Sequence, residues 1–146
     1  MKNLILLSVG ALALSACAPM MASAPYTLAP QAAAPAGIVP VGTVSASRSA
    51  ATTITSARVT GLAANTYYVA HYHLMGNAST DPCKSGGPLI MSSMMVGQTD
   101  AAGTLNLSGT ALTADIAGAT YFNVHTSKDS VGTPADAGVA CTPVTP

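Results

Sequence analysis

Short stretches rich in Val, Thr, Ile and Tyr alternate with clusters of Gly, Asn, Asp and Ser from Val41 onward, and no helical period of apolar residues is sustained there. Strand-like stretches bounded by turn residues are typical of an antiparallel β-sandwich or β-barrel. We therefore expect an all-β domain of about eight strands. The expected strands cover residues 41–48, 51–60, 66–75, 92–98, 103–109, 111–116, 119–126 and 138–144.

The connections between these strands differ in length. A tight turn is expected at Asp100-Ala101-Ala102-Gly103, where Gly103 can adopt a positive φ and join two strands as a hairpin. Two long segments, 76–91 and 127–137, contain no expected strand. Long loops on a small β-scaffold commonly carry the functional residues.

The first sixteen residues have the pattern of a secretory signal peptide. Lys2 is followed by an apolar run from Leu4 to Leu14, which is too short to span a membrane. The run ends in Leu-Ser-Ala-Cys17, which resembles the bacterial lipobox. This resemblance implies that residues 1–16 are removed and that an acylated Cys17 anchors the chain to a lipid bilayer of a bacterial cell envelope, facing the periplasm or the exterior.

Residues 17–41 are rich in Ala and Pro, and their prolines recur every five or six residues. This spacing disfavours both helices and β-ladders, so we expect a lipidated Cys followed by a semi-rigid tether, with the folded domain at 42–146. The alternative is that the segment packs partly on the domain through Tyr26 and Leu28.

The chain contains three cysteines. If Cys17 is acylated, Cys83 and Cys141 remain as an even pair in an oxidising compartment, and we expect them to form one disulfide. In the chain-entropy model, closing a loop of roughly 60 residues contributes on the order of 4 kcal/mol to stability.

Charge and composition exclude several classes of function. Five basic and five acidic residues give a net charge of zero, so the chain lacks a basic surface for nucleic acid. It has no G-x-S-x-G motif, no phosphate-binding loop and no dinucleotide-binding glycine pattern. Because Glu is absent and the Asp residues are scattered, a hydrolase with paired carboxylates is not expected.

The three histidines of the chain are His71, His73 and His125, and all fall in expected strands. Residues i and i+2 of a strand point to the same face, so His71 and His73 can converge on one point. A third histidine from another strand would complete a three-nitrogen site suited to copper or zinc. The alternative is that they are polar sheet-surface residues and a hydrogen-bonded core histidine.

Five motifs in the same order resemble the copper/zinc superoxide dismutase family. They are Gly61-Leu62, His71-Tyr72-His73, Cys83-Lys84-Ser85-Gly86-Gly87-Pro88, Val124-His125 and Ala137-Gly138-Val139-Ala140-Cys141. The resemblance covers 42–146. It implies a superoxide-dismutase-like Greek-key β-barrel, a Cys83–Cys141 disulfide that holds the first long loop, and copper ligation by His71, His73 and His125. A weaker similarity links Asn-Val-His125-Thr to chordin-type (CHRD) domains, which lack the disulfide.

The chain departs from the dismutase pattern at the zinc site and at the substrate-guiding residue. Leu89 stands where the family has the histidine that bridges copper and zinc, and the chain has neither a fourth His nor an Asp in 84–98. We therefore expect no zinc. The Arg that guides superoxide is absent before Cys141, and Lys128 shares its loop with two Asp residues, so attraction of an anionic substrate is expected to be weak.

Methionines are concentrated directly after the first long loop, at Met91, Met94 and Met95. A thioether is a soft donor that favours Cu(I). We expect Met94, and in second place Met91, to be the candidate fourth ligand. The alternative is that these methionines fill gaps in a core with few aromatic residues.

Together these features predict a copper-binding, superoxide-dismutase-like envelope lipoprotein that sequesters or delivers one copper ion, as Cu(I) or Cu(II), in exchange with a donor or acceptor protein. An enzymatic role stays open, because a copper-only superoxide dismutase protecting against oxidative stress would use the same ligands. A structural envelope domain with vestigial histidines is the third possibility.

Overall fold

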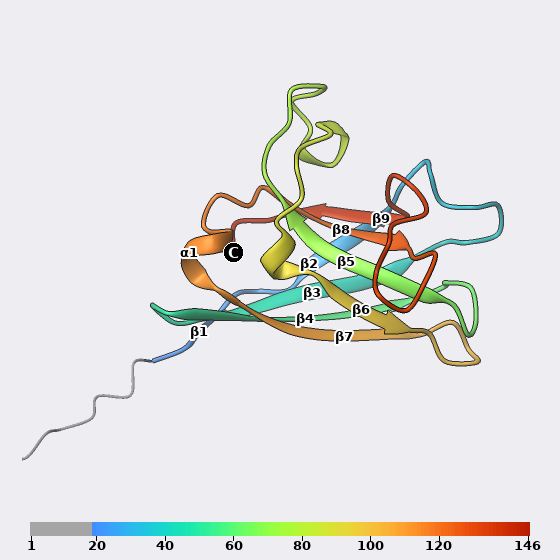
Figure 1. Ribbon diagram of the computed structural model, residues 1–146, viewed down its shortest axis with the longest axis horizontal. Coiled ribbons are helices and arrows are strands. Elements are labelled where there is room, and N and C mark those ends of the chain that lie inside the picture. Colours follow the sequence, from blue (N-terminus) through green and yellow to red (C-terminus); the bar gives the residue numbers. More distant parts are fainter. Residues whose placement is uncertain (1–18) are drawn as a thin grey trace, which may run out of the picture.

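The computed structural model describes residues 19–146 (Figure 1), so the expected signal peptide and Cys17 lie outside the described residues. The strands are β1 (Met21–Ala22), β2 (Tyr26–Pro30), β3 (Val41–Arg48), β4 (Thr52–Thr60), β5 (Tyr67–His73), β6 (Met95–Gln98), β7 (Leu105–Leu112), β8 (Tyr121–Thr126) and β9 (Ala140–Pro143). Three short helical turns are 3₁₀ helix η1 (Pro82–Lys84), 3₁₀ helix η2 (Met91–Ser93) and α-helix α1 (Thr113–Ile116).

All strands belong to one antiparallel sheet with the order β6-β5-β8-β9-β2-β3-β4-β7, and β1 pairs with β3. The connections from β4 to β5 and from β7 to β8 cross over neighbouring strands, which gives the Greek-key arrangement (Figure 1). The sheet curls into a nearly closed barrel in which β6 and β7 meet at the seam. The expected fold class is therefore confirmed.

Two glycines allow β6 and β7 to approach each other at this seam. A Cβ on Gly97 would lie 2.7 Å from a methyl group of Leu107, and a Cβ on Gly109 would lie 2.6 Å from Cγ of Met95. The seam is thus closed by side-chain packing and not by a ladder of backbone hydrogen bonds.

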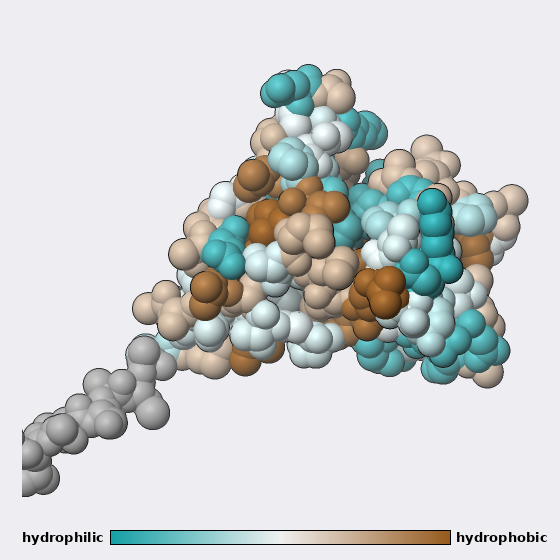
Figure 2. Space-filling view, viewed as in Figure 1, coloured by the Kyte–Doolittle hydropathy of each residue, from teal (hydrophilic) through white to brown (hydrophobic). Residues whose placement is uncertain are grey.

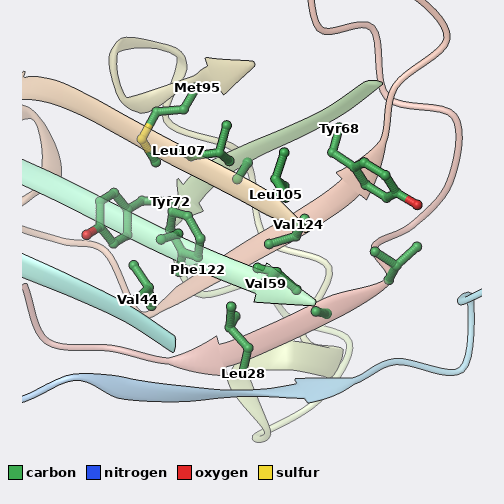
Figure 3. Packing of buried hydrophobic residues seen from close by; sticks show 14 of the residues in the cluster. Leu28, Val44, Val59, Tyr68, Tyr72, Met95, Leu105, Leu107, Phe122 and Val124 are labelled. Carbon is green, nitrogen blue, oxygen red and sulfur yellow. The ribbon is translucent and has the colours of Figure 1, made fainter. Parts of the chain in front are cut away.

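The core fills the barrel with alternate residues of each strand (Figure 3). Tyr72 and Phe122 pack edge to face with ring centroids 5.1 Å apart, and the Tyr72 hydroxyl and the Thr55 hydroxyl are hydrogen-bonded at 2.9 Å. This bond satisfies the only polar atom that the Tyr72 side chain brings into the core.

Two details of the strand prediction are wrong. Residues 105–112 form a single strand, and 113–116 form α1 instead of a strand. The chain turns there because buried Thr113 donates a hydrogen bond to the Ser49 carbonyl at 3.0 Å. The turn ending at Gly103 has the expected positive φ of 73°, but β6 and β7 form no hairpin ladder.

The expected tether is also wrong where the structure describes it. β2 lies inside the sheet, paired with both β3 and β9, and Leu28 is buried in the core. The alternative, packing through Tyr26 and Leu28, is the arrangement found, and the folded domain therefore begins well before residue 42. The prolines permit this because Pro25 precedes the strand and Pro30 ends it, positions at which a missing N–H is tolerated.

The expected disulfide between Cys83 and Cys141 is confirmed. It joins η1, within the first long loop, to β9 in the sheet. Within residues 19–146, no helix is long and apolar enough to cross a membrane.

Candidate metal centre

The outer face of β5 and β8 carries all three histidines. Tyr72 on β5 and Phe122 on β8 point into the core. Because side chains alternate along a strand, His71, His73 and His125 lie on the opposite face of the sheet. This confirms the prediction that the two histidines of β5 share a face.

The antiparallel register brings His125 to the pair on β5. Val69 pairs with His125, and His71 pairs with Asn123, so His125 lies diagonally across from His71. One nitrogen of each of the three imidazoles lies within 4.8 Å of the others. The ring centroid of His71 is 4.6 Å from that of His73 and 4.8 Å from that of His125. All three histidines lie close enough to bind one metal ion.

The two long loops bury this outer face, so that His71, His73 and His125 are only 1%, 7% and 5% exposed. Gly132, with φ of 93°, sets the 127–139 loop against β5 and β6, because a Cβ there would lie 2.6 Å from a methyl group of Val96. Gly138 also has a positive φ, and a Cβ there would clash with the side-chain amide of Asn123. Figure 1 shows the 74–94 loop at the top of the view and the 127–139 loop at the right, whereas β1 lies at the lower left.

Backbone carbonyls fix the orientation of two of the imidazoles. Nδ1 of His73 is 2.8 Å from the Gly87 carbonyl, and Nδ1 of His125 is 3.0 Å from the Asp136 carbonyl. Since a carbonyl only accepts, each Nδ1 carries the proton and each Nε2 presents a lone pair. Such outer hydrogen bonds are typical of metal-ligating histidines.

The remaining imidazole nitrogens are buried without partners. They are Nε2 of His73, Nε2 of His125 and both ring nitrogens of His71. Buried polar atoms of proteins nearly always have a hydrogen-bond partner, so a group of orphaned nitrogens at one point fits a metal ion. The residues present therefore fit the copper ion that the dismutase resemblance implies.

Burial keeps these histidines neutral. Desolvation, assisted by the nearby His125 and His73, lowers the pKa of His71 to about 3. Desolvation also lowers the pKa of His73 and of His125, although the bonds to Gly87 and Asp136 oppose it. The Asp136 carboxylate lies 3.7 Å from Nδ1 of His125, yet burial remains the larger effect. Neutral imidazole is the form that binds metal.

Sequence reasoning missed two residues that hold the ligands in place. Tyr121 stacks on His73, and its hydroxyl donates to the Gly87 carbonyl at 3.2 Å. The carboxylate of Asp136 accepts hydrogen bonds from the backbone amides of Thr126 and Gly138, and these bonds fix the residue whose carbonyl accepts from His125. Tyr121 was detectable, because it lies four residues before His125 and therefore on the same strand face. Asp136 carries no comparable sequence signal.

The methionines occupy different positions around the site. Met95 pairs with Ala70 and is buried in the core, whereas Met94, which directly precedes β6, is 38% exposed. Sδ of Met94 would lie 3.4 Å from a Cβ added to Gly132, which places it beneath the 127–139 loop. Met91 begins η2 and is 66% exposed. Ligation by Met94 or Met91 stays a prediction.

The sequence resemblance to the dismutase family assigns Leu89 to the position of that family's bridging histidine. Leu89 forms an isolated β-bridge with His73 and is partly exposed. Leu89 therefore lies beside a candidate ligand, but its aliphatic side chain offers no ligand atom.

No protein-family model matches this chain, and no curated protein is significantly similar to it. The assignment of a function therefore depends on the geometry of the site and on the sequence motifs.

Proposed function

We propose that the protein is a copper-binding lipoprotein of a bacterial cell envelope that sequesters or delivers one copper ion. The observation that supports this most strongly is the convergence of three buried, partner-free imidazoles within 4.8 Å. His71, His73 and His125 are the proposed ligands.

Copper is favoured over zinc by the donors near the site. Three neutral imidazoles suit either metal, but the thioether of Met94, which lies beneath the 127–139 loop, is a soft donor that suits Cu(I) and not zinc. The similarity of the five motifs to copper/zinc superoxide dismutases supports the same choice, because the copper-type ligands are retained and the zinc-type ligands are replaced.

The protein residues would hold the ion and limit its exposure. The Gly87 and Asp136 carbonyls fix the histidine tautomers, and the two loops shield the site from bulk water. Bound copper would supply a one-electron redox centre with room for a further ligand.

Sequestration or delivery is favoured over catalysis by the local charges. The 127–139 loop carries Lys128 together with Asp129 and Asp136, so no positive field would draw an anionic substrate toward the site. A copper-only superoxide dismutase is the second candidate function, because three imidazoles leave part of the coordination sphere open to a small substrate.

Anchoring through an acylated Cys17 is part of the proposal. The Cys83–Cys141 disulfide supports an oxidising location, since such bonds persist outside the reducing cytosol. A donor or acceptor of copper in the same compartment would complete the function.

Metal loading of the full chain in detergent tests the proposal. We expect native mass spectrometry to show one copper ion per chain and no retained zinc, with copper lost in His71→Ala and in His125→Ala. Asn106→Ala, an exposed substitution on β7, is the matched control and should bind copper normally. Absence of copper binding, or binding that survives the histidine substitutions, would refute the proposal. Dismutase turnover well above that of free copper would instead favour the enzyme.

A further inference from the structure

The folded domain begins immediately after the proposed lipid anchor. Met21, four residues after Cys17, already pairs with Arg48 of β3. Two hydrogen bonds between Ser23 and Ala46 attach the same segment. The Ser23 amide donates to the Ala46 carbonyl at 2.7 Å, and the Ala46 amide donates to the Ser23 hydroxyl at 3.0 Å. The chain therefore joins the sheet of the barrel within a few residues of Cys17.

The covalent chain limits how far the domain can stand from a bilayer. Four residues span at most about 14 Å when fully extended. An acylated Cys17 lies at the level of the lipid headgroups, so β1 must lie within that distance of them. This step rests on the acylation of Cys17 in the proposed function.

The rim of the barrel nearest to the anchor consists of β1, the β3–β4 turn and the end of β7. Its exposed apolar side chains are Met20, Met21 and Leu112 at 47%, 76% and 57% exposure. Two open hollows of about 240 Å³ each lie at this rim, and Met21 and Arg48 line both. Apolar side chains with one cation suit the boundary between headgroups and acyl chains.

The histidine site lies on another part of the molecule. In Figure 1 β1 lies at the lower left, whereas the 74–94 loop lies at the top and the 127–139 loop at the right. Most hydrophilic residues visible in Figure 2 also lie at the top and right.

We propose that this rim rests against the phospholipid headgroups and that the histidine site faces the aqueous compartment. The membrane is then an orienting surface as well as an anchor. Copper exchange would occur with a partner in solution or in the opposite membrane. Because Arg48 is the single basic side chain of this rim, the contact requires no anionic lipid.

Single-tryptophan variants test this orientation, because the chain contains no Trp. Leu112→Trp reports on the rim, and Val131→Trp, at a 73% exposed apolar position of the far loop, is the matched control. The acylated full chain is reconstituted in phosphatidylcholine vesicles that contain a lipid with a nitroxide on its headgroup. We expect quenching of Leu112→Trp and none of Val131→Trp.

A longer tether provides the second arm of the experiment. A Gly/Ser linker of about 20 residues inserted after Ala18 adds an r.m.s. reach of about 25 Å, which should restore the fluorescence of Leu112→Trp. Equal quenching of the two variants would overturn the proposal, whereas quenching of Leu112→Trp that persists after insertion would support it, because the rim would then bind the headgroups without the short tether. An N-terminal peptide without acyl chains would overturn it as well. Copper titration of the same vesicles is independent, so a failure of copper binding is distinguishable from a failure of orientation.

Discussion

Tyr121 lies face to face against His73, with ring centroids 4.4 Å apart and an interplanar angle of 11°. Its hydroxyl donates to the Gly87 carbonyl, which also accepts from Nδ1 of His73. One carbonyl in the first long loop thus fixes a proposed ligand and the aromatic ring that supports it.

Removing the Tyr121 hydroxyl should weaken the site without unfolding the barrel. Tyr121→Phe keeps the stacking on His73 and loses one hydrogen bond, which costs about 1 kcal/mol of unfolding free energy. We expect copper affinity to fall up to about tenfold, because a group that orients a ligand is lost. Copper competition titrations and urea unfolding measure both effects. In Tyr121→Leu, which also loses the stacking, both losses should be larger. Equal copper affinity in the unmodified chain, Tyr121→Phe and Tyr121→Leu would show that the contact between Tyr121 and His73 is only structural.

The fit of the 127–139 loop over the site depends on Gly132. Gly132→Ala places a Cβ 2.6 Å from the Val96 side chain at a residue with positive φ, so the loop must lift from β5 and β6. Gly37→Ala is the matched control, because its φ is 85° and nothing lies within 4 Å of the added Cβ. We expect Gly37→Ala to cost about 1 kcal/mol of stability from backbone strain alone, and Gly132→Ala to cost more. Copper affinity should fall only in Gly132→Ala, and a fall in both would contradict a closing role for the loop.

The place of β2 in the barrel predicts a large effect at Leu28. Leu28 is 3% exposed in the core, so Leu28→Ala should lower the free energy of unfolding by about 2–5 kcal/mol. The neighbouring Thr27→Ala, at an exposed position, is the control and should change it little. Equal, small effects in denaturant unfolding would mean that this segment is a tether after all.

The lowered histidine pKa values predict how the metal-free protein responds to acid. Burial holds the pKa of His71 at about 3 in the folded chain, against an ordinary value of 6.5. The unfolded chain therefore binds protons first, and stability should fall as the pH drops below about 6.5 and level off near 3. Urea unfolding of the apoprotein at several pH values measures this. The dependence should be weaker in His71→Leu, and an unchanged dependence would argue against a buried neutral His71.

Much of the sheet follows from the sequence because local patterns dictate it. Strand β3 has the expected bounds of 41–48, and the period-two rule places His71 and His73 on one face. The prediction failed at β2. Pro25 and Pro30 suggested a tether, but in the structure Pro25 directly precedes a five-residue strand and Pro30 is its last residue. It also failed at α1, where the contact from Thr113 to Ser49 joins residues far apart in the sequence.

The chemistry of the site was less predictable than its ligands. The burial of the histidines depends on loops whose close approach, at Gly132 and Gly138, involves distant residues. The two carbonyls that orient His73 and His125 belong to the backbone of the long loops. Every residue has a backbone carbonyl, so the residue types in the sequence do not indicate which carbonyl will accept these bonds.

X-ray absorption spectroscopy of the copper-loaded full chain tests most directly whether the three histidines form a copper site. We predict a first shell with imidazole nitrogens from His71, His73 and His125 and, for Cu(I), one sulfur that disappears in Met94→Leu and persists in Met91→Leu. A spectrum without imidazole scattering, or one unchanged by His71→Ala, would contradict a copper site at this position.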